Sequence, residues 1–223
     1  KDTVNAFTLY RGIVLGIAGL LAVFLTNLFV IKGTSMLPAT AALAWAVLAY
    51  VCVDFGFLEQ LFGKNALDER IWRAGAEVAL ASGLVIFLFT YLNLSRWHAN
   101  LAYATLAWVL GLGTLFGVAI YDPSIAAGIA RMSFALTAMA GIVLIVFLGF
   151  NRYDRAILLI PSWLVIIAWM LAAWLAVTGR IDNDIVQPAL AFGLVLIVLL
   201  IGFTVMQHAF AGGAYQQGLF SDL

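Results

Sequence analysis

Residues 189–206 read ALAFGLVLIVLLIGFTVM and contain no charged side chain. A helix that crosses a lipid bilayer needs about 20 consecutive apolar residues, and this stretch with its apolar flanks is long enough. The whole chain has the same character, since 65% of its 223 residues are hydrophobic, 10% are charged and the mean hydropathy is +1.09. Soluble domains carry about 25% charged residues. This composition excludes a water-soluble globular domain and predicts an all-α integral membrane protein.

Apolar segments of this kind follow one another along the chain and are separated by turns of only a few residues. About seven spans fit into 223 residues at this pitch. We expect them at about residues 7–31, 37–62, 71–94, 97–120, 124–150, 156–177 and 185–210. Alternating strand patterns are absent, and short turns make consecutive helices antiparallel. The sequence therefore predicts a single seven-transmembrane-helix bundle with very short loops over residues 1–223, with prolines only in first turns.

The two ends of the chain favour the membrane part of a longer protein. The chain starts at Lys1 without the charged and apolar pattern of a signal peptide, and it stops within a polar stretch. We expect residues 211–223 to be a tail or a joint to an output domain. Gly212 and Gly213 are expected to end the last helix and to allow a swivel there. Cys52 is the only cysteine, so it forms no disulfide within the chain.

The charges exclude one class of partner and leave the membrane orientation open. Eleven Lys and Arg residues balance eleven Asp and Glu residues, so no basic face for nucleic acid is expected. We call side A the membrane side that holds the N-terminus and the turns after the second, fourth and sixth spans, and side B the opposite side. Lys and Arg are more numerous on side A, which favours a cytoplasmic N-terminus. Several of these arginines lie inside helical ends, and without them the two sides are even.

The most informative polar residues lie on the second and third spans, near side A. Asp54 and Glu59 belong to the second span, and Arg73 and Glu77 to the third. Ionisable groups inside a membrane are costly unless they are paired, so they normally face the bundle interior. Arg73 and Glu77 are spaced as an i,i+4 pair, and Asp54 or Glu59 can meet Arg73 across the short turn. These residues form an ion-pair clasp, a ligand-binding or proton-sensing pocket, or part of a charge relay.

Two further arginines and two aromatic residues complete the candidate ligand site. Arg11 and Arg131 lie near the side-A ends of the first and fifth spans, where they either attract an anionic ligand or lipid head group or snorkel to the head groups. Tyr50 and Trp169 lie in the middle of spans, where they pack in the core or line an apolar pocket. No catalytic residue, metal site or cofactor is predicted.

Several chemistries of membrane helices fit poorly. Retinal needs a lysine inside a span, and the lysines of this chain are terminal or in loops. An intramembrane protease would need a His-Glu-x-x-His motif or a deep serine within reach of a histidine, and neither is present. His98 and His208 both lie near side B, which permits bis-histidine haem ligation but favours interfacial anchoring.

Three short stretches resemble a known family. They are residues 10–16 (YRGIVLG), residues 44–50 (AWAVLAY) and the Asp54-Phe55-Gly56 that follows. They are similar to the bacterial seven-transmembrane receptors with diverse intracellular signalling modules (7TMR-DISM). In that family the membrane domain usually lies between an extracytoplasmic sensory domain and a cytoplasmic output domain such as a histidine kinase or a cyclic-di-GMP enzyme. The resemblance implies a multi-pass protein of the bacterial inner membrane, with the N-terminus outside and the C-terminus in the cytoplasm.

The expected function is therefore a sensory and signal-transducing membrane core that relays a ligand or membrane signal to a cytoplasmic effector. The chain itself carries no catalytic constellation, so any enzymatic activity is expected in an attached output domain. The alternative is a non-catalytic accessory or structural subunit of a larger membrane complex. A transporter would need an internal repeat and broken helices. The expected partners are the lipid bilayer, a small or anionic ligand, and a second copy of the chain or a larger membrane complex. The last of these is suggested by Gly-x-x-x-Gly spacings at residues 12–16 and 113–117, which permit close helix approach.

Overall fold

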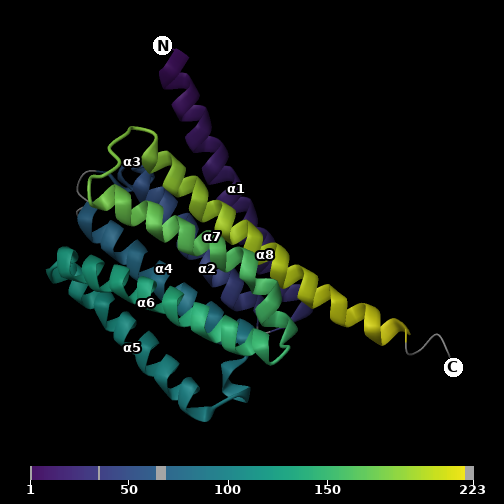
Figure 1. Cartoon of the computed structure of the whole chain (residues 1–223). Coiled ribbons are helices and arrows are strands. Elements are labelled where there is room, and N and C mark those ends of the chain that lie inside the picture. Colours follow the sequence, from purple (N-terminus) through teal and green to yellow (C-terminus); the bar gives the residue numbers. More distant parts are fainter. Residues whose placement is uncertain (1, 35, 64–68, 219–223) are drawn as a thin grey trace.

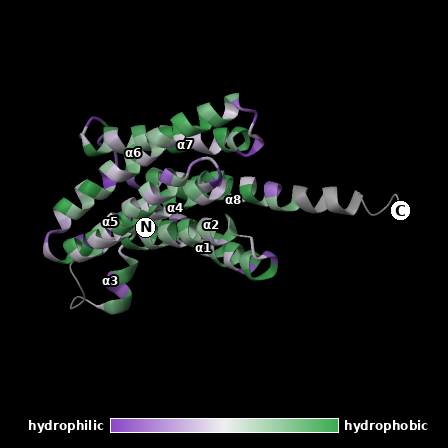
Figure 2. Cartoon of the chain, turned by 90° about the horizontal axis from the view of Figure 1, so that it is seen from below, coloured by the Kyte–Doolittle hydropathy of each residue, from purple (hydrophilic) through white to green (hydrophobic). Residues whose placement is uncertain are grey.

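The computed structural model describes residues 2–34, 36–63 and 69–218 and confirms the helical membrane architecture. Within these residues, seven helices are long and apolar enough to cross a membrane. They are α1 (Asp2–Lys32), α2 (Met36–Asp54), α4 (Glu69–Leu92), α5 (Ala99–Tyr121), α6 (Pro123–Phe150), α7 (Asp154–Val177) and α8 (Val186–Gly218). A short helix α3 (Phe57–Phe62) and a 3₁₀ turn at Leu94–Arg96 lie between them. Figure 2 shows apolar residues along the helices and polar residues mainly at the turns.

Five of the long helices form a closed ring. Helix α2 packs against α4, α4 against α6, α6 against α7, α7 against α8, and α8 returns to α2. Helix α1 packs outside this ring on α2 and α8, and α5 packs outside it on α4 and α6. Figure 1 shows α5 at the edge of the bundle and the N-terminal part of α1 projecting beyond it. The ring therefore defines an interior that the two outer helices do not reach.

The main core joins the helices of the ring to α1, smaller clusters join α5 to α4 and α6, and the core depends on small residues that let the helices approach. Phe87 and Tyr91 of α4 are completely buried, and their rings stack with centroids 5.4 Å apart. Buried alanines lie beside such large side chains on most of the helices. The Gly-x-x-x-Gly spacings at residues 12–16 and 113–117 do not bring helices of the bundle together. A Cβ at any of these four glycines would meet no described atom within 4 Å outside its own helix.

Two helix boundaries near side A follow from local sequence. Gly56 has a φ of 68°, a left-handed conformation that glycine adopts without strain, and it ends the turn that follows Asp54. The expected continuous span over residues 37–62 is therefore wrong, since α2 ends at Asp54 and α3 follows as a separate helix. At the start of α6, Asp122 accepts a hydrogen bond from Ile125 N at 3.3 Å, and Pro123 occupies the first turn.

Two other expectations about helix interiors are also wrong. Pro161 lies inside α7 and not in a first turn, although α7 remains one helix from Asp154 to Val177. Helix α8 does not end at Gly212 and Gly213 but continues to Gly218. Its 33 residues, at a rise of 1.5 Å each, span about 50 Å, whereas the hydrocarbon core of a bilayer is about 30 Å thick. Figure 1 shows α8 leaving the bundle at the end opposite to the start of α1.

Candidate functional site

A cavity of about 370 Å³ opens at side A, inside the ring of five helices. Each helix of the ring contributes to its wall. The lining includes Tyr50 and Asp54 from α2, Arg73, Glu77 and Leu80 from α4, Arg131 and Phe134 from α6, Trp169, Met170 and Trp174 from α7, and Gln187 and Leu190 from α8. This volume lies within the roughly 300–1,000 Å³ that is typical of small-molecule sites. The cavity is therefore large enough for a small ligand.

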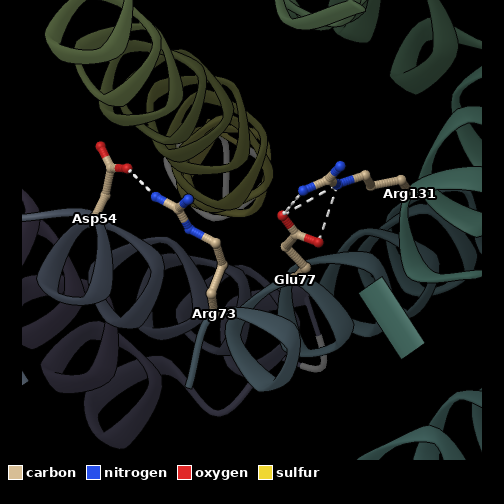
Figure 3. Close-up of polar contacts among 4 residues, drawn as sticks. All are labelled: Asp54, Arg73, Glu77 and Arg131. Carbon is tan, nitrogen blue, oxygen red and sulfur yellow. Dashed lines mark hydrogen bonds and ion pairs between the residues drawn. The ribbon is translucent and has the colours of Figure 1, made fainter. Parts of the chain in front are cut away.

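Two ion pairs cross between helices at this cavity, as Figure 3 shows. Arg73 Nη2 donates to Asp54 Oδ1 at 2.8 Å and joins α4 to α2. Arg131 donates from Nε and Nη2 to both carboxylate oxygens of Glu77, at 2.9 to 3.2 Å, and joins α6 to α4. The first contact agrees with the expectation that Asp54 or Glu59 meets Arg73. The second contact was not predicted, because the i,i+4 spacing suggested Arg73 as the partner of Glu77.

A signal for the missed pair exists in the sequence. Glu77 and Arg131 each follow the side-A start of their helix, Glu69 and Pro123, by about 12 Å of helix rise. Opposite charges at equal depth on two helices are natural partners in a low-dielectric interior. The sequence does not say that α4 and α6 are neighbours, and only the packing of the ring brings the two side chains together.

The aromatic part of the wall is fixed by Trp169. Its indole Nε1 donates to Leu190 O of α8 at 2.8 Å, and its ring meets Phe134 of α6 edge-on, with centroids 5.9 Å apart. A Cβ at Gly193 would lie 2.7 Å from Trp169 Cδ1, so only glycine leaves room for the indole against α8. Trp169 and Tyr50 are half-buried and line the cavity. Trp169 thus connects the cavity to the backbone of α8.

Two of the expected site residues lie outside the cavity. The guanidinium of Arg11 lies over the ring of Phe55, 5.6 Å from its centroid. Glu59 lies on α3 with an exposed side chain, and among the described residues it forms no ion pair. Next to Arg11, the Tyr10 hydroxyl donates to Pro188 O at 2.8 Å and joins α1 to the start of α8. Arg11 and Tyr10 therefore fasten α1 to the outside of the ring.

A second polar cluster lies at side B, around residues 208–210 of α8. Arg155 Nε donates to His208 Nε2 at 2.9 Å, and the Tyr91 hydroxyl donates to Arg155 O at 3.1 Å. Lys32 Nζ donates to Ala209 O at 3.3 Å and lies 4.1 Å from the centroid of the Phe210 ring. This cluster was not predicted, because His208 was expected only as a haem ligand or an interfacial anchor. These contacts attach α8 to α7 and α1 where it leaves the bundle, and they attach α7 to α4.

No group of three or more His, Cys, Asp or Glu side chains that could hold a metal ion is present in residues 2–34, 36–63 and 69–210. The two carboxylates at the cavity each contact an arginine. The arrangement can therefore bind a polar group through the guanidinium donors and an apolar group through the aromatic wall.

Comparison with known proteins agrees with this architecture at the level of the family. Neither the curated proteins nor the solved structures gave a match. The family model described as 7TM diverse intracellular signalling matches residues 7–208, which include most of each of the seven long helices and every residue of the cavity wall. The family is one of multi-pass membrane proteins with a role in signalling. The chain therefore belongs to the 7TM diverse intracellular signalling family.

Proposed function

We propose that this seven-helix domain is the signal-transducing core of a receptor, in which a ligand in the side-A cavity changes the packing of α8. The observation that supports this most is the position of Trp169, whose indole lines the cavity and hydrogen-bonds to the backbone of α8. A ligand that contacts this indole differently in two helix arrangements biases the equilibrium between them. Helix α8 then carries the change to side B and beyond the bundle.

The remaining parts of the proposal follow from the length and attachment of α8. Because α8 is longer than the bilayer is thick, its C-terminal part reaches the aqueous phase as a helix. We place this end in the cytoplasm of a bacterium, with the protein in the inner membrane and the N-terminus outside. The domain acts by binding and relaying a signal, and catalysis belongs to an effector that α8 controls.

Orientation is tested first by labelling single cysteines in a Cys52→Ala background. Thr3→Cys and Gly218→Cys lie at the two ends of the described helices. In intact cells, a membrane-impermeant maleimide is expected to label residue 3 but not residue 218. Lysed cells provide the control in which both residues are labelled. Labelling of residue 218 alone in intact cells would show the opposite orientation and would contradict the proposed direction of the signal.

The relay is tested with Gly193→Ala, in which the new Cβ displaces the Trp169 indole from α8. Spin labels at Ser95→Cys and Gln207→Cys, both exposed near side B, report the distance between the 3₁₀ turn that follows α4 and helix α8. We expect the mean distance to change by roughly 1–2 Å, the scale of helix shifts at packed interfaces. Pulsed electron paramagnetic resonance in lipid nanodiscs measures this distance distribution.

Gly202→Ala is the matched control on the same helix. A Cβ at Gly202 would lie 3.8 Å from Leu25, an ordinary van der Waals contact. We therefore expect the spin-label distance of Gly202→Ala to equal that of the unsubstituted protein. If Gly193→Ala also leaves the distance unchanged, the indole does not couple the cavity to α8, and the proposed relay is wrong.

A further inference from the structure

We propose that the side-A cavity binds a small amphipathic carboxylate. Its carboxylate group contacts Arg73 and Arg131, and its apolar part lies against Phe134 and Trp169. This inference rests on the proposed function, since it names the chemical class of the ligand that the receptor core senses.

The two ion pairs are oriented so that an incoming ligand meets guanidinium groups first. The side chains of Asp54 and Glu77 are 8% and 9% exposed, whereas those of Arg73 and Arg131 are 38% and 52% exposed. The carboxylates therefore lie behind the arginines. Although the four charges sum to zero, the accessible surface of the cluster is cationic, and that surface favours an anion.

Both arginines have unused donors. A guanidinium carries five N–H donors. Arg73 uses Nη2 on Asp54, and Arg131 uses Nε and Nη2 on Glu77. Within the described part of the chain, Nη1 of each arginine and Nε of Arg73 form no hydrogen bond. The planar fork of a guanidinium matches the two oxygens of a carboxylate, and the hydroxyl-bearing side chain of Tyr50 lines the same cavity.

The rest of the wall requires an apolar body on the ligand. Leu80, Phe134, Trp169, Met170 and Leu190 face the cavity from four helices. Apolar surface of this kind stabilises a hydrocarbon or an aromatic ring, and it offers nothing to a sugar or a peptide backbone. A cavity of about 370 Å³ limits the ligand to a small molecule. The combination of unused guanidinium donors and an aromatic wall therefore selects an amphipathic carboxylate.

The test compares three probes with the same apolar body and different polar groups. They are 4-phenylbutyrate, 4-phenylbutylamine and 4-phenylbutanol. Saturation-transfer NMR and radioligand binding measure their affinity for the purified protein in nanodiscs of neutral phosphatidylcholine, with empty nanodiscs as the background. We expect the carboxylate to bind roughly 10- to 100-fold more tightly than the amine or the alcohol, as charge-assisted hydrogen bonds contribute on that scale.

Two substituted proteins assign this preference to the arginines. The paired substitution Arg131→Gln with Glu77→Gln keeps a hydrogen-bonding pair between α6 and α4 but removes both charges. We expect it to weaken 4-phenylbutyrate binding roughly tenfold and to leave 4-phenylbutanol unchanged. The exchange Arg131→Glu with Glu77→Arg is expected to turn the preference toward 4-phenylbutylamine. Circular dichroism shows which variants fold. If the charge-exchange variant does not fold, the neutral variant with Arg131→Gln and Glu77→Gln still decides the test.

A second arm separates two sources of the carboxylate. Competition of 4-phenylbutyrate by dodecanoate in the nanodisc supports a fatty acid of the bilayer as the ligand. Binding of 4-phenylbutyrate without such competition supports a soluble acid. Equal affinity for the three probes, or unchanged carboxylate binding in the neutral pair, overturns the proposal. Because these experiments measure binding and the Gly193→Ala experiment measures the position of α8 without a ligand, failure of one does not imply failure of the other.

Discussion

Arg131→Ala is expected to lower the free energy of unfolding by about 3 kcal/mol, because it leaves a buried carboxylate without its partner. Glu77 is 9% exposed, and its two oxygens accept hydrogen bonds from Nε and Nη2 of Arg131 at 2.9 to 3.2 Å. The substitution removes all of these donors together. Reversible unfolding in mixed micelles, followed by circular dichroism as the denaturing detergent increases, measures the difference.

Two controls separate this effect from the loss of a charge alone. Arg96→Ala removes an exposed arginine outside the helix ring and is expected to change stability by less than about 0.5 kcal/mol. Adding Glu77→Gln to Arg131→Ala replaces the buried carboxylate by a neutral amide, and we expect it to restore about 2 kcal/mol. If Arg131→Ala were no more harmful than Arg96→Ala, the pair with Glu77 would make no contribution to the fold.

The helical architecture could be predicted from the sequence because the bilayer imposes it. Backbone polar groups inside the membrane are satisfied within a helix or between the strands of a closed barrel, and a long apolar stretch without alternating polar residues, such as residues 189–206, indicates a helix. The ends of the helices could not all be predicted, because they depend on single residues. Gly56 ends a span that the hydropathy alone continues to Phe62, whereas Gly212 and Gly213 do not end α8.

The candidate site could be predicted only in part, for a reason that lies in packing. The pair of Asp54 and Arg73 joins two spans that are consecutive in the sequence, so a short turn is enough to suggest it. The pair of Glu77 and Arg131 joins α4 to α6, and apolar periodicity does not reveal which helices are neighbours in a ring. The same is true of Trp169, whose role depends on Gly193 of α8.

Gly141→Ala is expected to destabilise the protein by about 2–3 kcal/mol, because the added methyl group overlaps a buried indole. A Cβ at Gly141 would lie 2.5 Å from Trp163 Cε2 of α7. Trp163 is 2% exposed, and its Nε1 donates to Ala138 O of α6 at 2.9 Å. We expect a movement of the indole away from the added methyl group to weaken this hydrogen bond or to separate α6 from α7. The same detergent titration measures the loss.

Gly128→Ala is the matched control on the same helix. It lies on the exposed face of α6, where a Cβ would meet nothing within 4 Å. Alanine has a higher helix propensity than glycine by up to about 1 kcal/mol, so this variant is expected to be unchanged or slightly more stable. Adding Trp163→Phe to Gly141→Ala is expected to recover part of the loss, because the smaller ring leaves room for the methyl group.

These variants test a contact that occurs twice on α7, in which a tryptophan of α7 packs on a glycine of a neighbouring helix. Trp163 lies on Gly141 of α6, and Trp169 lies on Gly193 of α8. Each indole also donates to a backbone carbonyl of the helix on which it lies. Both neighbours of α7 in the ring are thus held by a tryptophan over a glycine, and only the second of these contacts lines the cavity. Equal stability of Gly141→Ala and Gly128→Ala would show that α6 and α7 are not held in this way, and the spacing of the cavity wall would need another cause.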